Sequence, residues 1–451
     1  MKIIIVGCGR VGRTLAEKLN LDGNEVTVID VNSEKVNTIT ERCDIMGVVG
    51  NGAKHTVQQE AGVDNADLLI AVTDSDELNL LCCVVAKKQG NCQTIARLRS
   101  PEYRTEAAYL QDELGIAMVI NPEYEAAKEI ARVLRFPSAI KIEPFAKGKV
   151  ELIKFRLQKG NAIIGMSVKE VVAKYRADIL VCTVERGEDA YIANGDFVFA
   201  EKDVVSIVAS TKNANEFFQN IKYKGHSIKD ALIVGGNMIT EYVCEILERS
   251  NISLKIVEKD YKVCEGLSAK WHKATVIHGD GADHELLVEE GVERAGAFLA
   301  LADLDEENIL LSVYAKGVGE GKVITKIKRM DYDKVLSRLD LDTIICPKNI
   351  TSDIILRYVR SRENAAGSNV ETLYNIIQDK VEASEFIVKE GSPIVGVPLS
   401  QLKFKKDILI ASITRGDEVL VPRGQTEILA GDAVVVVSKQ IGLSDVADVL
   451  K

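Results

Sequence analysis

A glycine-rich hexapeptide near the N-terminus has residue types and spacing that suit the binding of a pyrophosphate. Gly7-Cys8-Gly9-Arg10-Val11-Gly12 follows an apolar strand predicted over residues 3–6 and opens a helix predicted over residues 12–21. In such a turn the first glycine permits the tight reversal, the second lets the backbone approach the phosphates, and the third lets the helix pack against the sheet. The free amides and the positive end of the helix dipole would then hold the phosphates.

Polar residues at the ends of three further predicted strands complete this site. Asp30 lies at the end of the second strand (26–29), where its carboxylate would bind ribose hydroxyls and favour NAD or an adenine nucleotide over NADP. Thr73 and Asp74 end the fourth strand (68–71), and Arg97 ends the fifth (93–96), where the carboxyl ends of parallel strands meet at a ligand. Arg97 and Arg99 would either neutralise phosphate charge or form a surface ion pair. We therefore predict an NAD(H) site here.

The elements that position these residues occur twice in the chain. Residues 3–103 match residues 231–332, with Glu258 opposite Asp30, and the segments that follow each copy also match. We call the four parts A, B, A′ and B′. Each A part alternates short apolar strands with helices, which is typical of a doubly wound parallel sheet, whereas each B part has the short strands and turns of a small α+β module. The predicted fold class is therefore α/β, a tandem duplication of a Rossmann-like domain, each followed by a small α+β domain.

Two predicted helices connect the A and B parts. The predicted segments are A over 1–121, a connecting helix over 122–136, B over 137–222, A′ over 228–346, a second connecting helix over 347–362, and B′ over 363–451. The first helix carries an apolar stripe that includes Ala126, Ala127 and Ile130. On a lone helix this stripe would be exposed, so we expect a module of another chain to cover it, unless the helix packs inside its own chain.

The second copy departs from the glycine pattern. Gly235 keeps the first glycine, but Asn237 and Thr240 replace the second and third, and the Cβ of Asn237 would intrude on a pyrophosphate. We expect this copy either to bind nucleotide on different terms or not to bind it. The residues of this second candidate site are Gly235, Gly236, Asn237, Met238, Ile239 and Glu258.

Composition excludes several classes of ligand. The net charge of −10 argues against nucleic acid or an anionic membrane surface as the main partner. No apolar run approaches the roughly 18 residues that a membrane helix needs, and no secretory signal precedes the first strand, so we expect a cytoplasmic protein without direct membrane insertion. The nine cysteines fit reduced thiols, and the stretch from His278 to His284 is expected to be a turn, so no metal site is predicted.

The sequence offers no convincing catalytic group beside the predicted nucleotide sites. A dehydrogenase needs a proton donor facing its substrate, and neither B part supplies a suitable cluster. The GxSxG and HExxH motifs and the Walker lysine are also absent from the sequence. We therefore predict a binding protein with no catalytic residue rather than an enzyme. An NAD-dependent oxidoreductase of unusual layout is the alternative.

Taken together, these motifs resemble the TrkA family. Its members are the peripheral regulatory subunits of bacterial Trk potassium uptake systems and consist of tandem RCK modules (regulators of conductance of potassium). The resemblance covers essentially the whole chain. It rests on the glycine loop with Asp30, the runs 71–79 and 96–103, and the glycines of the last module, Gly391, Gly396, Gly424 and Gly431.

The resemblance implies a regulatory role in potassium uptake, with NAD(H) and ATP or ADP as competing ligands. It implies a membrane-embedded Trk-type potassium channel or transporter subunit as partner, at the inner face of the cell membrane, and a homotetrameric ring. Nucleotides would then shift the arrangement of the ring and act on the pore of the partner. A regulator of another cation transporter is the alternative. The sequence leaves open which nucleotide activates and whether the B parts bind a second messenger such as cyclic di-AMP.

Overall fold

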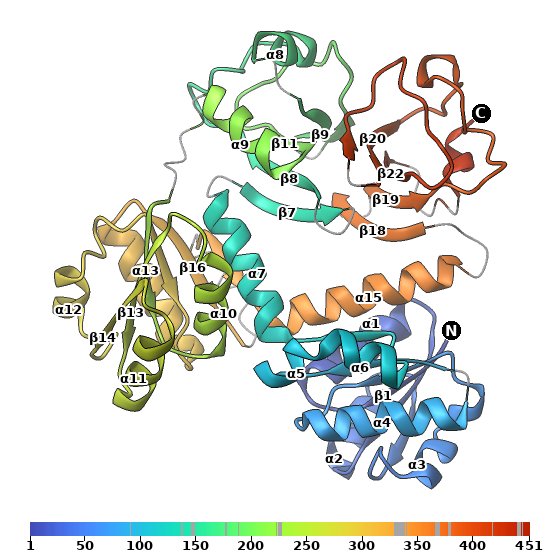
Figure 1. The fold of residues 1–451 in the computed structure, drawn as a ribbon, viewed down its shortest axis with the longest axis vertical. Helices are drawn as coiled ribbons and strands as arrows, with labels where there is room; N and C mark the ends of the chain where they lie inside the picture. Colours follow the sequence, from blue (N-terminus) through green and yellow to red (C-terminus); the bar gives the residue numbers. More distant parts are fainter. Residues whose placement is uncertain are drawn as a thin grey trace. The chain divides into compact units, whose positions relative to one another are not determined.

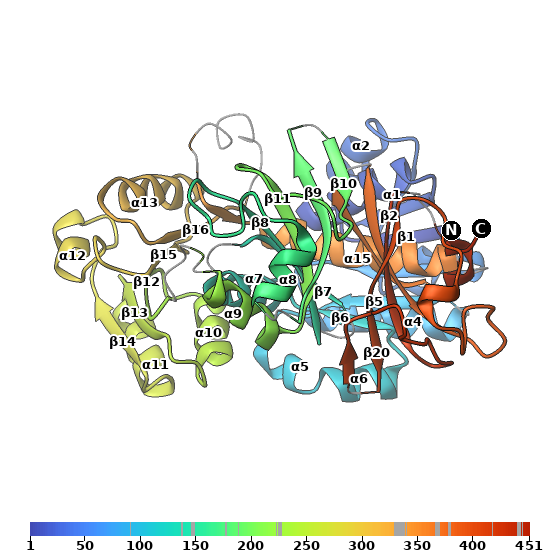
Figure 2. The ribbon, with the colours of Figure 1, turned by 90° about the horizontal axis from the view of Figure 1, so that it is seen from above.

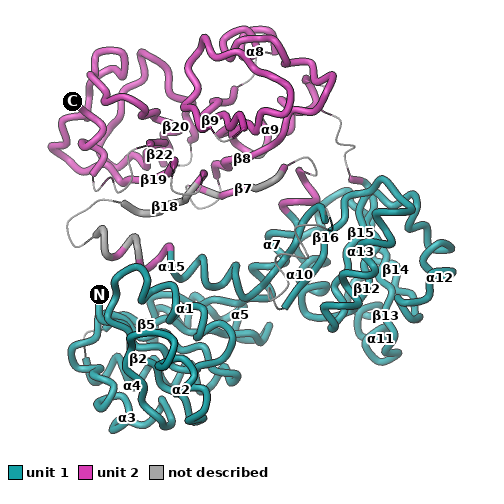
Figure 3. Tube along the Cα trace, turned by 180° about the vertical axis from the view of Figure 1, so that it is seen from behind, with its two compact units in different colours: residues 1–131, 229–356 teal, residues 132–228, 357–451 magenta. Residues whose placement is uncertain are grey.

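The chain folds into two compact units, each of which combines segments from both halves of the sequence (Figure 3). The computed structural model describes residues 1–90, 92–136, 139–145, 149–175, 178–187, 189–221, 223, 228–328, 339, 341–365, 370–377, 380–416, 418–439, 443 and 445–451. One unit contains residues 1–131 and 229–356, and the other contains residues 132–228 and 357–451. Like modules therefore share a unit. Residues 137, 138 and 222, at the ends of the predicted B segment, lie outside the described residues.

The A module is built on a six-stranded parallel sheet in the order β3-β2-β1-β4-β5-β6. Its strands are β1 (Lys2–Val6), β2 (Glu25–Asp30), β3 (Met46–Val49), β4 (Leu68–Ala71), β5 (Gln93–Arg97) and β6 (Met118–Ile120). Its helices are α1 (Arg10–Leu21), α2 (Ser33–Thr40), α3 (His55–Glu60), α4 (Asp76–Gln89), α5 (Pro101–Thr105) and α6 (Ala107–Leu114), with a 3₁₀ turn η1 (Val63–Asn65). Because helices cover both faces, residues 3–6 of β1 and all of β4 are buried apolar runs with no alternation.

The A′ module repeats this architecture, in the order β14-β13-β12-β15-β16-β17. Its strands are β12 (Asp230–Val234), β13 (Ser253–Glu258), β14 (Ala274–His278), β15 (Ala297–Ala300), β16 (Lys322–Lys326) and β17 (Thr343–Ile345). Its helices are α10 (Met238–Leu247), α11 (Tyr261–Lys270), α12 (His284–Glu289) and α13 (Asp305–Val318). Figure 2 shows α13 on one side of this sheet and α10 and α11 on the other. The doubly wound parallel architecture predicted for both copies is confirmed.

The B and B′ modules are antiparallel five-stranded sheets that make up the second unit. Their orders are β10-β9-β11-β8-β7 and β18-β19-β22-β20-β21. The B module has β7 (Ala139–Phe145), β8 (Val150–Arg156), β9 (Leu180–Arg186), β10 (Asp189–Ile192) and β11 (Val204–Ala209), with helices α8 (Val168–Tyr175) and α9 (Thr211–Asn220). The B′ module has β18 (Val370–Ile377), β19 (Val381–Ile387), β20 (Ile408–Arg415), β21 (Glu418–Leu420) and β22 (Ala433–Ser438), with 3₁₀ turns η3 (Leu399–Gln401) and η4 (Val446–Val449).

The two antiparallel sheets share one hydrophobic core. Phe145 and Leu152 of B pack in the same buried cluster as Val381, Val435 and Val437 of B′. Each module also has a second, private core on its other side. Because strand side chains alternate between faces, one face of each sheet joins the shared core and the other faces its own helices and loops. B and B′ are therefore held together by apolar burial.

The connecting helices are α7 (Pro122–Arg135) and α15 (Pro347–Ala365) (Figure 1). The division between the two units falls within each of them (Figure 3). The expectation that another chain must cover the stripe on α7 is wrong. Ala126, Ala127 and Ile130 are fully buried within this single chain. At the start of α7, Tyr124 packs edge-on against Tyr242 of α10, with ring centroids 5.3 Å apart. Among the described residues no helix is both long and apolar enough to cross a membrane.

Candidate nucleotide site

The glycine loop of the A module is held in the tight turn that its sequence predicts. Gly7 has a φ of +104°, a conformation that residues with a Cβ rarely adopt. A Cβ on Gly12 would lie 1.8 Å from the carbonyl oxygen of Gly7, so only glycine lets α1 start this close to β1. Both positions therefore require glycine because of packing within the loop, whether or not a ligand binds.

The second glycine of the motif has a different role. Gly9 is the N-cap residue of α1, with a φ of −68°, and a Cβ placed there would meet no atom within 4 Å. Since glycine has no side chain to cap the helix, the first amides of α1 stay available to an outside acceptor. An anion can approach this helix end without displacing any protein group.

Asp30 braces the loop from the end of β2. One carboxylate oxygen accepts a hydrogen bond from the amide of Cys8 at 2.6 Å, and the other accepts from the amide of Asn32 at 2.9 Å. Each oxygen keeps a further lone pair for a ribose hydroxyl. Burial, reinforced by the nearby charge of Asp30, raises the pKa of the Cys8 thiol to about 12, so this cysteine is an inert part of the loop.

The loop after β4 meets the end of β5 through Asn79. Strand β4 ends at Ala71, as predicted, and Thr73 and Asp74 follow in the loop at its carboxyl end. The Thr73 hydroxyl donates to Asn79 Oδ1 at 2.7 Å, and Asn79 Nδ2 donates to the carbonyl of Arg97 at 2.8 Å. Asn79 is fully buried and ties the two predicted ligand segments together.

Arg97 is a largely buried cation with unused hydrogen-bonding capacity. Its Nη2 donates to the Thr73 carbonyl at 2.7 Å and pairs with the exposed carboxylate of Asp74 at 3.3 Å. Within the described part of the chain, its buried Nε has no hydrogen-bond partner. A buried donor without a partner is costly, so an anion at this point would stabilise the guanidinium.

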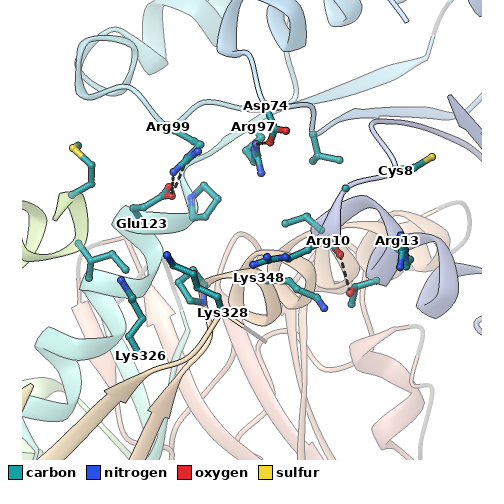
Figure 4. A pocket seen from close by; sticks show the side chains of 18 of the residues that line it. Cys8, Arg10, Arg13, Asp74, Arg97, Arg99, Glu123, Lys326, Lys328 and Lys348 are labelled. Atoms are coloured by element: carbon teal, nitrogen blue, oxygen red, sulfur yellow. Dashed lines mark hydrogen bonds and ion pairs between the residues drawn. The ribbon is translucent and has the colours of Figure 1, made fainter. Parts of the chain in front are cut away.

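A cavity of about 880 Å³ joins these groups to residues of the A′ module (Figure 4). Nine cationic side chains and four anionic ones line it, which gives the cavity an excess of positive charge. The cationic residues are Arg10, Arg13, Lys35, Arg42, Arg97, Arg99, Lys326, Lys328 and Lys348, and the anionic residues are Glu17, Asp74, Glu123 and Asp303. Cys8, Gly9, Val11, Asn237, Met238 and Ile239 also line the cavity, so both phosphate loops open onto the same space.

Lys326 and Lys328, the two A′ lysines of the cavity, donate hydrogen bonds to backbone carbonyls and to the carboxylate of Asp303. Lys326 Nζ donates to the Leu301 carbonyl at 2.8 Å, and Lys328 Nζ donates to the carbonyl and carboxylate of Asp303 at 2.8 and 3.1 Å. Burial, with help from the neighbouring charge of Lys328, lowers the pKa of Lys326 to about 8. Burial opposes the ionisation of Asp303, but the hydrogen bond and charge of Lys328 outweigh it and lower the pKa of Asp303.

The phosphate loop of A′ satisfies its own helix end. Asn237 caps α10 by accepting from the amide of Ile239 at 3.0 Å, and its Nδ2 donates to the Leu301 carbonyl. The Thr240 hydroxyl donates to the Gly235 carbonyl at 2.5 Å, where the A module has Gly12. Glu258 accepts from the amide of Gly236 at 2.6 Å, as Asp30 does for Cys8. An anion would have to compete with the Asn237 side chain here.

A separate cavity of about 360 Å³ lies beside this second loop, between it and Glu258. Gly235, Gly236 and Asn237 line it, and its charged residues are Glu258, Lys259, Asp260, Asp280, Asp303 and Glu307. Five of these six are acids, so the second cavity repels phosphates whereas the first attracts them. The two copies thus differ in electrostatics more than the loop substitutions alone suggest.

The predicted residues fall into three groups in the structure. Those at the 880 Å³ cavity are Cys8, Gly9, Arg10, Val11, Asp74, Arg97, Asn237, Met238 and Ile239. Gly235, Gly236 and Glu258 line the smaller cavity, and Asn237 lines both. Gly7, Asp30 and Thr73 shape the first loop from behind and are not among the residues that line the cavity.

Sequence reasoning missed several cations of the cavity. Lys326 and Lys328 match Arg97 and Arg99 in the repeat, and this correspondence could have included them. Arg13, Lys35 and Lys348 gave no comparable signal, since single basic residues on helices are common. Of these, Lys348 lines the same cavity as the first phosphate loop because A and A′ share one unit.

Comparison with known proteins agrees with this architecture. The TrkA-N domain model matches residues 3–122 and 231–347, and the TrkA-C domain model matches residues 152–222 and 383–451. The chain belongs to the TrkA family. It is 31% identical to the Trk system potassium uptake protein TrkA homolog 1 of Methanosarcina mazei over 100% of both chains. It is 30% identical to TrkA of Haemophilus influenzae, over 97% of this chain and 95% of the relative.

Solved structures share the fold of this TrkA-family chain at low sequence identity. The GsuK channel has a TM-score of 0.66 at 15% identity, covering 97% of this chain and 77% of the channel. The crystal structure of the GsuK RCK domain has a TM-score of 0.63 at 16% identity, covering 97% and 92%. The same channel in a structure described as bound to NAD has a TM-score of 0.64. The tandem order of parallel and antiparallel modules is therefore shared with these structures.

Proposed function

We propose that this chain is the nucleotide-binding regulatory subunit of a Trk-type potassium uptake system. The observation that carries the proposal is the cavity to which both A and A′ contribute cationic groups. A phosphate ligand held there contacts both modules at once. Its binding therefore favours the arrangement of A and A′ in which both sets of groups reach it, and this selection couples a nucleotide to the conformation of the subunit.

The proposed ligands are NAD(H) at the first site, with ATP or ADP as competitors. All of them carry phosphates, which suit the uncapped start of α1 and the cationic excess of the cavity. They also suit the Nε of Arg97, which has no partner among the described residues. The ribose next to the adenine would be bound by Asp30, which keeps free lone pairs beside the loop. Gly7 through Val11, Asp30, Thr73, Asp74 and Arg97 form this proposed site.

The second site, made of Gly235 through Ile239 and Glu258, is proposed to bind nucleotide more weakly than the first. The cap on α10 and the acidic lining of the smaller cavity both oppose a phosphate. Titration with NADH should therefore give two unequal classes of site, or one site per chain. Two identical sites per chain would contradict the assignment.

The proposed partner is a membrane-embedded Trk-type potassium channel or transporter subunit, at the inner face of the cell membrane. The full-length relatives are named as proteins of the Trk potassium uptake system, which supports this choice. We further propose that four chains form a ring. Light scattering tests the ring, because a mass near the 49.4 kDa of one chain, or a dimer at all concentrations and nucleotide conditions, would rule it out.

Potassium uptake in cells tests the function directly. Uptake should fall when the chain is removed and return with the wild-type chain, but lose its dependence on nucleotide with Arg97→Ala. Arg249→Ala, at an exposed residue outside both cavity linings, is the matched control. Unchanged uptake without the chain would refute the proposal. Consumption of NADH by purified protein with candidate acceptors would favour an NAD-dependent oxidoreductase instead.

A further inference from the structure

We propose that Tyr242 of the A′ module positions Arg99 in the first nucleotide site, and thereby couples that site to the second phosphate helix, α10. This inference rests on the proposed function, because it assumes that phosphates bind in the shared cavity. Arg99 lines that cavity and extends from the loop after β5. Its guanidinium forms an ion pair with the carboxylate of Glu123 at 2.7 Å. A bound phosphate would replace this carboxylate as the partner of Arg99.

The backbone of Arg99 is fixed from both sides. Its amide donates to Asp76 Oδ2 at 2.8 Å, at the start of α4. Its carbonyl accepts from Asn121 Nδ2 at 3.0 Å, and the same Nδ2 lies 3.1 Å from the Tyr242 hydroxyl. The Tyr242 hydroxyl is itself 3.4 Å from the Arg99 carbonyl. The A′ module therefore closes a hydrogen-bonded triangle around the backbone that carries Arg99.

Aromatic and ionic contacts hold Tyr242 in this place. Its ring is buried and meets the Tyr124 ring edge-on, with centroids 5.3 Å apart. The Arg104 guanidinium lies 4.7 Å from the Tyr124 ring and 5.3 Å from the Tyr242 ring, and it pairs with Glu245 at 2.6 Å. Tyr242 and Glu245 are three residues apart on α10, so one face of this helix contacts the A module.

The same helix carries the second phosphate loop at its other end. Asn237 caps α10 and Met238 begins it, and both line the shared cavity. Tyr242 is about one turn further along. Because an α-helix moves nearly as a rigid body over one turn, a ligand that shifts the start of α10 must also shift the hydroxyl that supports Arg99.

Among the residues that the structure describes, this contact is made on one side only, although the two modules are repeats. In the repeat, Tyr242 corresponds to Thr14 and Asn121 corresponds to Cys346. The Thr14 hydroxyl bonds within its own helix, to the Arg10 carbonyl at 3.1 Å. On that side α1 and α15 are joined by an ion pair between exposed side chains, Lys18 and Asp353. Among the described residues, the A′ module thus supports Arg99 of A, while no equivalent contact from A supports Lys328 of A′.

Calorimetric titration of the full chain with NADH tests this positioning role. Tyr242→Phe removes only the hydroxyl and should weaken NADH binding about fivefold, and Arg99→Ala should weaken it at least as much. If Tyr242 acts through Arg99, Tyr242→Phe should have no further effect in the Arg99→Ala background. Both single variants should also lower the salt dependence of binding, which a general loss of folding would not do. Tyr109→Phe, at an exposed tyrosine of α6, is the control.

Independent, additive effects of the two substitutions, or unchanged binding by Tyr242→Phe, would overturn the inference while the nucleotide site itself stood. If the wild-type chain bound no NADH at all, the proposed function would fall as well. Asn121→Ala provides a second variant, in case Tyr242→Phe alters folding, and it should show the same loss of additivity with Arg99→Ala. Thermal unfolding of each variant establishes that the comparison is made between folded proteins.

Discussion

Binding of a phosphate ligand should draw a proton onto Lys326. In the free protein burial lowers the pKa of this lysine from 10.5 to about 8, while its ammonium lines the 880 Å³ cavity. An anion bound nearby favours the charged form and raises the pKa again. The perturbation is therefore a change of pH from about 7 to about 10, with NADH as ligand because its diphosphate does not titrate in this range.

The magnitude follows from the distance at which a phosphate can approach. Two opposite charges about 4 Å apart at an effective dielectric constant of about 20 attract by about 4 kcal/mol, or about three pKa units. The pKa of Lys326 in the complex should thus return close to its ordinary value. The affinity for NADH is then highest below pH 8, where the amine of Lys326 is charged both in the free protein and in the complex. It falls by up to about tenfold per pH unit between about 8 and 10, where only the complex keeps the proton.

Calorimetry in two buffers of different ionisation enthalpy measures the proton directly. At about pH 8.5 the wild-type chain should take up about three-quarters of a proton per NADH bound. Lys326→Met should abolish this uptake, and the Leu301 carbonyl would still accept from Asn237. Lys322→Met is the matched control, since burial also lowers the pKa of Lys322 but this residue does not line the cavity. Equal proton uptake by wild type and Lys326→Met would refute the reasoning.

Three further substitutions probe the loop and the B modules. Gly9→Ala should leave the midpoint of urea unfolding unchanged, because the new methyl group meets no protein atom within 4 Å. It should weaken NADH binding at least about tenfold, because the methyl group enters the space that the phosphates need. Wild-type affinity in this variant would show that the ligand binds elsewhere. Asp30→Ala should weaken NADH binding by about 1–3 kcal/mol, and calorimetry showing the wild-type affinity would remove Asp30 from the site. Asp432→Ala should cost about 2–4 kcal/mol in urea unfolding. Its buried carboxylate pairs with Arg415 at 2.8 Å and caps the amide of Leu429, as Asp203 does with Arg186 in the B module. A loss below about 1 kcal/mol would mean that the pair adds little.

Local patterns in the sequence predicted the modules and the first phosphate loop. Strand β4 occupies the residues predicted for it, because a strand covered on both faces needs an unbroken apolar run between turns. The glycine loop was equally visible, since Gly7 needs a positive φ and Gly12 must avoid the Gly7 carbonyl. Both requirements are set by residues a few positions apart, so they leave a signature in one short stretch.

Tertiary structure alone decided which modules meet and what lies between them. The sequence predicts an oligomer surface on the apolar stripe of α7, but this stripe is buried within the single chain, in the unit that pairs A with A′. The same pairing places Lys348 in the cavity of the first phosphate loop and Tyr242 beside the Arg99 carbonyl. Such contacts join residues more than a hundred positions apart, and they depend on the packing of whole surfaces. Periodicity and loop chemistry report the environment of each segment, and they carry no information about which distant segment supplies it.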